Sequence, residues 1–330
     1  MEPGNFDGNA PELIVTLGEA LVDMVGEAGD AGGLADAVTF HRAAGGAPAN
    51  VAVGAARLGA AAGFVGKVGA DPFGDHLIGT FVAEGVDVSQ VSRSEEFPTA
   101  LAFVSHGAAG EREFTFYRHA AADLQLRPDD FAHDYVAGAA LLHVGSLSLT
   151  AEPARSATYA ALEVARGAGV PRSVDPNLRL DQWPDAATAR RTVIELSTHA
   201  SVLKVSEEEL EFLAGSTGAR GAASLMHEDL LLLCVTRGAA GVEYYTPSAA
   251  GSVAGFAVRP VDTTGAGDAF VAALLVGLSR TGGLEDALDD LALLERILLR
   301  ANAFAALTVT RKGAIPAMPS LTELEAFLGK

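Results

Sequence analysis

A segment in the C-terminal third of the chain, VDTTGAGDAF, combines two glycines with a carboxylate. The next residues, 269–278, are almost all apolar and predict a buried helix. A helix N-terminus offers unpaired N–H groups and partial positive charge, so Gly265, Ala266 and Gly267 are suited to hold a phosphate. The carboxylate of Asp268 is poorly suited to bind a phosphate, because like charges repel. It is well suited to accept a proton from a hydroxyl that attacks the phosphate. The segment therefore predicts phosphoryl transfer to an alcohol.

Two other interpretations of this segment stay open from its residues alone. In the first, the glycines form a tight turn, and Asp268 is an acidic first-turn residue that complements the helix dipole. The second is a dinucleotide-binding fingerprint, but Phe270 occupies the position of its third glycine. The chain also contains no Gly-x-x-x-x-Gly-Lys-Ser/Thr motif, which argues against a P-loop nucleotidase.

The composition is that of a globular protein with a large excess of acidic residues. The chain has 330 residues, 49% of them hydrophobic, and we expect one domain over residues 1–330. The formal net charge of −19 disfavours nucleic acid or an anionic membrane as a partner. Any anionic ligand must therefore be held by local donors, because the overall field of the protein repels it.

Other features of the sequence bear on cellular location. No apolar run reaches the length of a membrane span. Residues 1–11 lack the basic and apolar regions of a signal peptide, and we expect them to form a flexible tail. Cys234 is the only cysteine, so no intrachain disulfide can form, and its apolar neighbours predict a buried strand position. Together these features predict a cytoplasmic protein.

Short apolar runs alternate with helical patterns along most of the chain. The predicted strands are residues 13–17, 63–68, 141–144, 173–175, 202–205, 231–235 and 255–260. The predicted helices are residues 49–58, 73–84, 153–166 and 207–214. This alternation predicts an α/β fold with a mostly parallel sheet that helices cover on both faces. Ligand sites in such folds lie beyond the C-terminal ends of the strands.

One region does not follow this alternation. Residues 99–105 and 113–118 alternate apolar and polar side chains around a glycine-containing turn at 107–110, which predicts an antiparallel hairpin. Residues 38–42 would join the hairpin in a small sheet. An ordinary edge hairpin explains the pattern as well as a lid over a binding site does.

A second motif, GGAPANVAVGAARLG at residues 45–59, points to a family. Together with the segment around Asp268, it resembles the PfkB (ribokinase-like) carbohydrate kinase family, and the similarity extends over residues 18–319. Four shorter runs look like those of fructokinases: residues 18–23, 116–118, 175–179 and 309–314.

This resemblance implies a ribokinase-like fold, in which a mostly parallel Rossmann-like sheet flanked by helices carries a small β-sheet lid. The lid would be formed by segments near residues 13–23, 38–44 and 97–120. The resemblance also implies transfer of the γ-phosphate of ATP to a sugar hydroxyl with Mg²⁺. Lids of this family often pair, which implies a homodimer through the lid.

For the sugar, the resemblance points to residues whose side chains or amides suit hydroxyl groups. They are Asp23, Gly45, Gly46, Asn50, Tyr117, Arg118 and Arg179. A carboxylate accepts bonds from two hydroxyls, glycines allow close approach of the backbone, and Asn50 can both donate and accept. Tyr117 and Arg118 would reach from the lid toward the sugar, and Arg179 would clamp the phosphoryl group or the sugar. Without the resemblance, these residues are also explained by ordinary turns, by the start of a helix or by exposed surface positions.

For the nucleotide, the resemblance points to residues near the ends of two predicted strands and to one helix. They are Lys204, Thr236, Gly238, Gly241 and Asn302. Thr236 and Gly238 would contact the ATP phosphates, and Lys204 would neutralise phosphate charge. Asn302 lies among small residues that would line the adenine pocket. An isolated strand-end turn and ordinary helix packing are the alternatives.

Metal binding is also implied by family motifs. Glu209 matches the glutamate of the family's Asn-x-x-Glu magnesium motif, although Ser206 replaces the asparagine. We expect Glu209 to order metal-bound water, since Mg²⁺ prefers to keep water and phosphate ligands. Ser206 and Glu209 also form a good capping box, and both roles are compatible. Asp262 and Thr264 match positions that bind a monovalent cation in related kinases, which implies dependence on K⁺.

These observations favour a sugar kinase that converts fructose to fructose 6-phosphate. Asp268 would be the general base, and the amides of residues 265–268 would form the anion hole. Phosphorylation of 2-keto-3-deoxygluconate or ribose on the same fold is the nearest alternative. A catalytically silent, kinase-like binding protein is the alternative from another class, and a nicotinamide dehydrogenase is a more distant one.

Overall fold

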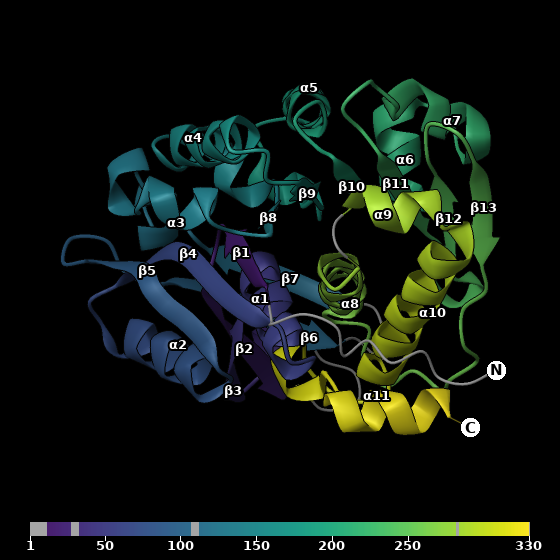
Figure 1. Cartoon of the computed structure of the whole chain (residues 1–330). Coiled ribbons are helices and arrows are strands. Elements are labelled where there is room, and N and C mark those ends of the chain that lie inside the picture. Colours follow the sequence, from purple (N-terminus) through teal and green to yellow (C-terminus); the bar gives the residue numbers. More distant parts are fainter. Residues whose placement is uncertain (1–11, 28–32, 107–111, 282–283, 330) are drawn as a thin grey trace.

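The strands of the chain form two sheets, one of nine strands and one of four (Figure 1). The computed structural model describes residues 12–27, 33–106, 112–281 and 284–329. The tail expected at residues 1–11 and the turn expected at 107–110 lie outside this part of the chain.

The larger sheet has the strand order β13-β12-β11-β10-β9-β8-β1-β4-β5. Neighbouring strands are parallel from β5 to β11, and β12 and β13 add an antiparallel edge. Its strands are β1 (Leu13–Leu17), β4 (Ala61–Gly69), β5 (Val86–Ser94), β8 (Leu141–Val144), β9 (Arg172–Val174), β10 (Val202–Ser206), β11 (Leu232–Thr236), β12 (Val242–Tyr245) and β13 (Ala250–Val253). The six strands predicted between residues 13 and 235 are confirmed, whereas β5, β12 and β13 were not predicted.

Helices cover both faces of the large sheet, as the alternation predicted (Figure 1). One face carries α3 (His133–Ala137), α4 (Ala154–Gly167), α5 (Ala186–Ser197), α6 (Glu207–Ala214) and α7 (Gly218–Leu225). The other carries α1 (Ala47–Arg57), α2 (Pro72–Ala83), α8 (Ala266–Ser279), α9 (Leu284–Asp289), α10 (Leu291–Thr308) and α11 (Leu321–Leu328). Short 3₁₀ turns complete the described elements: η1 (Leu34–Asp36), η2 (Ala122–Gln125), η3 (Pro128–Asp130), η4 (Leu147–Thr150), η5 (Leu180–Gln182), η6 (Gly238–Ala240) and η7 (Ile315–Ala317).

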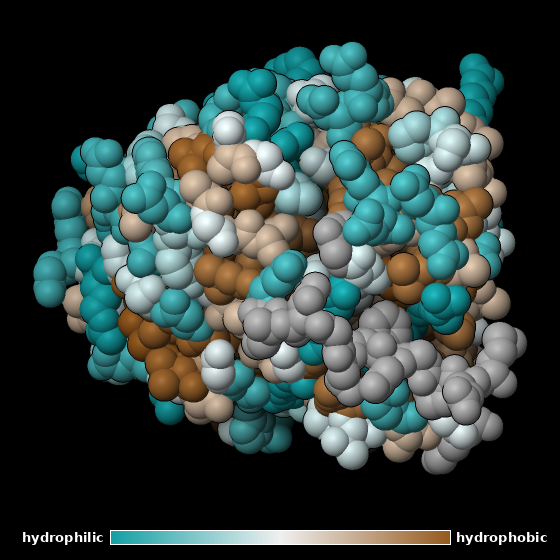
Figure 2. Space-filling view, viewed as in Figure 1, coloured by the Kyte–Doolittle hydropathy of each residue, from teal (hydrophilic) through white to brown (hydrophobic). Residues whose placement is uncertain are grey.

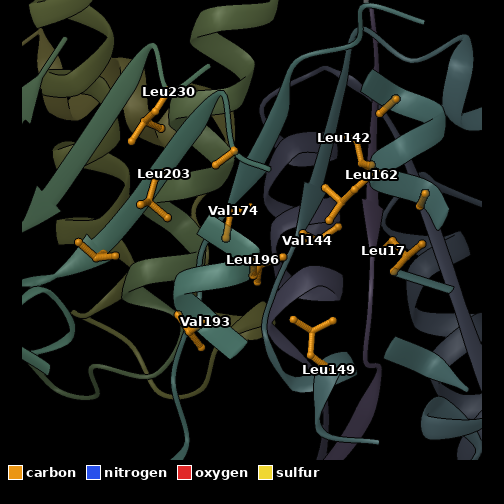
Figure 3. Close-up of a cluster of buried hydrophobic side chains, with 14 of the residues drawn as sticks. Leu17, Leu142, Val144, Leu149, Leu162, Val174, Val193, Leu196, Leu203 and Leu230 are labelled. Atoms are coloured by element: carbon orange, nitrogen blue, oxygen red, sulfur yellow. The ribbon is translucent and has the colours of Figure 1, made fainter. Parts of the chain in front are cut away.

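A separate hydrophobic core lies on each face of the sheet. Figure 3 shows part of the first, where Leu142, Val144 and Val174 of neighbouring strands face Leu162 of α4 and Leu196 of α5. These side chains are fully or almost fully buried. The second core forms around α8, every residue of which from Asp268 to Ser279 is buried. Two packed layers therefore hold the strands rigidly, and with them the loops at their C-terminal ends.

The small sheet has the order β3-β2-β6-β7 and is built from β2 (Leu21–Glu27), β3 (Thr39–Gly45), β6 (Ala100–His106) and β7 (Arg112–Tyr117). The antiparallel pairing of β6 with β7 confirms the predicted hairpin. Strand β2 was not predicted, and it joins the hairpin to β3 by pairing with both. The expectation that residues 13–17 belong to the lid is wrong, because β1 pairs with β4 and β8 in the large sheet. The chain leaves that sheet only after Gly18.

The strand predicted at residues 255–260 is also absent. After β13 the backbone runs without helix or strand until α8 begins. The two ends of this stretch bond to α10 and to the residue that follows it. Asn302 Nδ2, inside α10, donates to the carbonyls of Val253 and Ala254, and the amide of Val261 donates to the carbonyl of Val309. Within this stretch, Phe256 packs its ring on Phe327 of α11 and joins the second core.

The visible surface is of mixed hydropathy. On the face shown in Figure 2, hydrophobic residues form separate groups among hydrophilic ones. Within the described part of the chain, no helix has both the length and the apolar character needed to cross a bilayer.

Candidate active site

A cavity of about 150 Å³ lies where the C-terminal ends of the parallel strands meet the small sheet. The loops after β1 and β9 contribute Glu19, Asn177 and Arg179 to its lining. The remaining lining includes β2, β7 and the first turns of α1 and α8. A water-sized group needs roughly 10–15 Å³ of such space. The cavity therefore suits a small polar molecule of about ten non-hydrogen atoms.

The first turn of α8 borders this cavity and is shaped by glycine. Gly265 is the N-cap and has a φ of +75°, a conformation in the left-handed region that favours glycine. The amide of Ala266 donates to the carbonyl of Thr263 at 3.3 Å. First-turn amides have no partner inside their helix, so the amides of Gly267 and Asp268 are the donors best suited to an anion. The predicted contribution of Ala266 is correspondingly weaker.

Asp268 is held from both sides by amide groups. Asn50 Nδ2 donates to its Oδ2 atom at 2.8 Å, and Asn177 Nδ2 donates to Oδ1 at 3.3 Å. The side chain is buried, with 6% of the residue exposed, yet it lines the cavity. Each carboxylate oxygen can accept a further hydrogen bond, so the group can receive one from a hydroxyl in the cavity.

The electrostatic surroundings of Asp268 suit a base. Burial is the main cause that raises its pKa, to about 6, and repulsion from Asp175 adds to the rise. The hydrogen bond from Asn50 lowers the pKa. The positive charges of Lys204 and Arg179 oppose the shift. A carboxylate with this pKa is ionised at neutral pH and still binds a proton more readily than an ordinary aspartate.

Lys204 lies directly behind the turn of α8. A Cβ atom at position 267 would come within 3.0 Å of its Nζ atom, so the glycine there permits the approach of the ammonium group. Lys204 Nζ also bonds to Asp175 Oδ2 at 3.0 Å, and both side chains are buried. Burial lowers the pKa of Lys204, but the nearby carboxylates outweigh it and raise the pKa overall. The lysine therefore stays charged beside the anion-binding turn.

The Gly45–Gly46 pair brings two acidic side chains close to the start of α1. A side chain at position 45 would collide with the carboxylate of Asp23, and one at position 46 with the carbonyl of Glu19. Gly46 is the N-cap with a φ of +103°. Asn50 is inside the helix, where it reaches Asp268, and does not cap it.

Asp23 and Arg179, which the family resemblance assigned to the sugar, both line the cavity. Burial raises the pKa of Asp23 to about 7, and repulsion from Asp268 and Asp262 adds to the rise. The charge of Arg179 opposes it. Arg179 Nη1 donates to the carbonyl of Leu178 at 3.1 Å, which holds the guanidinium group against the loop after β9.

Tyr117 and Arg118 do not face the cavity in this structure, contrary to expectation. Tyr117 is 65% exposed and packs its ring on Phe103. Arg118 is 3% exposed and forms a 2.6 Å ion pair with Asp123. Phe116 lines the cavity instead, because successive strand residues point to opposite faces of the sheet.

The comparison with known proteins agrees with this geometry. The model of the pfkB family of carbohydrate kinases matches residues 11–321. The chain belongs to this family. It is 48% identical over 318 residues to probable fructokinase-4 of Arabidopsis thaliana, and the alignment covers 96% of each chain.

Solved structures of family members have the same fold. A fructokinase from Xylella fastidiosa with bound ATP is 37% identical, with a TM-score of 0.89, and the match covers 97% of this chain and 99% of that one. A double mutant of the fructokinase from Vibrio cholerae O395, with fructose, ADP and potassium bound, is 34% identical. Its TM-score is 0.84, with 97% of this chain and 100% of that one covered.

The residues that the family resemblance assigns to the nucleotide lie outside the cavity. Thr236 ends β11, and the turn after it contains Gly238 and Gly241, both with positive φ. A Cβ atom at position 241 would collide with the carbonyl of Val253. Asn302 is buried in α10 and ties down the end of β13 through two 3.1 Å bonds. The turn and the helix thus meet at β13, beyond the C-terminal end of β11.

The residues expected at metal sites are engaged in local hydrogen bonds. Glu209 closes a capping box with Ser206, and its other oxygen accepts the amide of Leu178 at 2.7 Å. Asp262 Oδ1 accepts both the amide and the hydroxyl of Thr264, and Oδ2 accepts the amide of Gly313. In the described part of the chain, no three His, Cys, Asp or Glu side chains gather as metal ligands. Because both oxygens of Glu209 already accept backbone amides, this carboxylate fits a cation that it contacts through water.

Glu19, Asn177 and Phe116 are among the residues that line the cavity but received no role from the sequence. Glu19 and Asn177 stand inside runs that resemble fructokinases, but no role was assigned to them. The Pro-Asn dipeptide was a turn signal, and Asn177 indeed adopts a φ of +42°. To predict that Phe116 lines the cavity, one must know which face of β7 points toward the cavity. The alternating pattern alone does not determine this.

Proposed function

We propose that this protein transfers the γ-phosphate of ATP to fructose and forms fructose 6-phosphate. The observation that carries the proposal is the buried carboxylate of Asp268, held by Asn50 and Asn177 at the first turn of α8 and facing a sugar-sized cavity. The relatives named fructokinase, in a plant and in two bacteria, favour fructose among the sugars.

In the proposed reaction, Asp268 accepts the proton of a fructose hydroxyl while the oxygen of that hydroxyl attacks the γ-phosphorus. The bond between this phosphorus and the bridging oxygen breaks, and ADP leaves. The amides of Gly267 and Asp268 donate to the transferring group, and the ammonium of Lys204 adds positive charge behind them. Asp23 and Arg179 hold the sugar or the phosphoryl group in the cavity.

The nucleotide would bind beyond the end of β11, along the turn that contains Thr236, Gly238 and Gly241 and toward Asn302. Mg²⁺ would neutralise phosphate charge, and Glu209 is the carboxylate that we assign to its water ligands. A monovalent cation, K⁺, would bind near Asp262 and Thr264. The carboxylate of Asp262 already organises the turn before α8, so occupation there would tune the anion hole.

A sugar screen tests the proposal. ADP formation is measured with fructose, ribose and 2-keto-3-deoxygluconate, in KCl and in NaCl, with and without Mg²⁺. We expect kcat/KM for fructose to exceed that for the other two by about tenfold or more, because the pocket's polar groups must each find a hydroxyl. Higher kcat/KM for another sugar would reassign the substrate, and no turnover with any sugar would favour a binding protein.

A further inference from the structure

Glu19 is a buried carboxyl group at the edge of the sugar cavity with one oxygen unused. The residue is 3% exposed, lies two residues after β1 and lines the cavity. Its Oε1 atom accepts the amide of Ala47 at 3.0 Å. Its Oε2 atom has no hydrogen-bond partner in the described part of the chain. A buried polar atom without a partner is destabilising, so the site favours a ligand that supplies one.

The nearest positive charge does not satisfy this oxygen. Arg118 donates through Nε to Asp123 at 2.6 Å, through Nη1 to Thr150 at 3.2 Å and through Nη2 to the carbonyl of Leu147 at 3.0 Å. The guanidinium group is thus committed to other partners among the described residues and does not pair with Glu19. Arg118 stabilises the charged form of Glu19 only at longer range.

The position of Glu19 separates it from the reacting group. Glu19 contacts the first residue of α1, whereas Asp268 is held by Asn50, three residues further along the same helix. Three residues correspond to a rise of about 4.5 Å along the helix axis. Glu19 and Asp268 are thus bonded to different positions of α1, which favours different sugar hydroxyls for the two carboxyl groups.

We propose that Glu19 binds a second hydroxyl of the sugar through Oε2, and thereby contributes to sugar specificity while Oε1 fixes the start of α1. This inference rests on the proposed function. The chemistry of the group fits the role: burial raises the pKa of Glu19 to about 7. Near neutral pH the carboxyl is present in both forms, and its protonated form can donate as well as accept.

The test combines a variant with sugars that each lack one hydroxyl. Binding of fructose and of its 1-, 3- and 4-deoxy derivatives is measured by titration calorimetry, together with kcat and KM. In the wild type we expect one deoxy sugar to bind about ten- to hundredfold more weakly than fructose. In Glu19→Met, fructose binding should fall by a similar factor and discrimination against that one deoxy sugar should disappear. Discrimination against the others should persist.

Two further variants keep the test decisive. Glu19→Gln retains an acceptor for the amide of Ala47 and should restore part of the affinity, also if Glu19→Met folds poorly. Thr16→Val is the matched control, since Thr16 Oγ1 is also buried and unpartnered among the described residues, but Thr16 does not line the cavity. That variant should leave every sugar constant unchanged.

The outcomes separate the two proposals. Equal weakening of all sugars in both Glu19 variants, with the discrimination unchanged, would reduce Glu19 to a support for α1 and overturn the inference alone. Wild-type affinity in Glu19→Met would overturn it as well. Wild-type protein that neither binds nor phosphorylates fructose would contradict the proposed function, and the inference with it.

Discussion

Asp268 combines two demands that normally conflict, because a base must be ionised although burial opposes its charge. The charged form of Asp268 is stabilised by hydrogen-bond donors on both sides of the carboxylate and by the ammonium group of Lys204 behind the turn. We expect Asp268→Asn to lower kcat about 10²–10⁴-fold, the usual cost of losing a general base. Fructose affinity should change little, because an amide at this position can accept from Asn177 through its oxygen. Its NH2 group can donate to Oδ1 of Asn50, which has no partner among the described residues, once the Asn50 amide turns over. Steady-state kinetics and sugar titration measure the two effects separately.

The pH dependence of the wild type follows from the same residue. Its pKa is raised to about 6, so the active, ionised form is lost as the pH falls below that value. The kcat/KM for the sugar should therefore decline on the acid side with a midpoint near pH 6. Asp181→Asn, which removes an exposed carboxylate beyond Arg179, should retain both the turnover and this midpoint. Wild-type turnover in Asp268→Asn would contradict the assignment of the base.

The chemical roles of single residues were predictable only where a backbone feature accompanied the side chain. Asp268 was identified because glycines and an apolar helix surround it in the sequence. The family pattern assigned Tyr117 and Arg118 to the sugar. In the structure, strand alternation points Tyr117 outward, and Arg118 forms an ion pair with the buried Asp123. Neither the register of β7 nor this partner can be deduced from local sequence.

At the scale of elements, the start of α8 depends on a glycine that has no room for a side chain. Gly265 has a φ of +75°, and a Cβ atom there would lie 2.9 Å from the Cα atom of Ala314. Gly169 has nearly the same φ, +74°, but a Cβ atom there would meet nothing within 4 Å. The pair therefore separates backbone strain from steric collision.

We expect Gly169→Ala to cost only the strain of a left-handed residue, about 1–2 kcal/mol of unfolding free energy, with kcat unchanged. Gly265→Ala adds collision and should cost roughly 2–4 kcal/mol. It should also displace the amides of Gly267 and Asp268, which lowers kcat about 10²–10³-fold. Chemical denaturation and steady-state assays of both variants measure this. Equal behaviour of the two variants would show that the contact with Ala314 is unimportant.

The order of elements was largely predictable, and the exceptions share a cause. Strands buried on both faces, such as β1 and β11, are largely apolar runs that stand out in the sequence. Strand β2 contains Asp23 and Gly26, and its pairing with β3 and β6 overrides a weak local preference. Residues 255–260 include apolar side chains, but they pair with no strand of the described chain. Without such pairing, the local preference alone does not produce a strand.

At the scale of the whole molecule, the cavity brings together three carboxyl groups in a protein that already carries a net charge of −19. Burial raises the pKa of Glu19 and Asp23 to about 7 and that of Asp268 to about 6. Among the described residues that line the cavity, Arg179 carries the positive charge. The substrate site is thus a place where function costs stability, as is common for binding sites before they are filled.

The sign of the resulting pH effect is definite. The folded-state pKa of each group lies above its unfolded value, 4.5 for Glu19 and 3.8 for Asp23. The folded protein therefore holds more protons than the unfolded chain between about pH 4 and 7. The contribution of these groups to stability is complete below pH 4 and is lost as the pH rises toward 7.

Asp23→Asn should accordingly stabilise the empty protein at pH 8 and leave its stability nearly unchanged at pH 4. The pKa rise of Asp23 to about 7 corresponds to at most about 4 kcal/mol, at about 1.36 kcal/mol per pKa unit. Partial solvent access reduces the expected gain to about 1–3 kcal/mol. Denaturation at the two pH values measures it, with Asp181→Asn as a control that removes the same charge from the surface. A gain of equal size at both pH values would mean that Asp23 packing, and not its ionisation, limits stability.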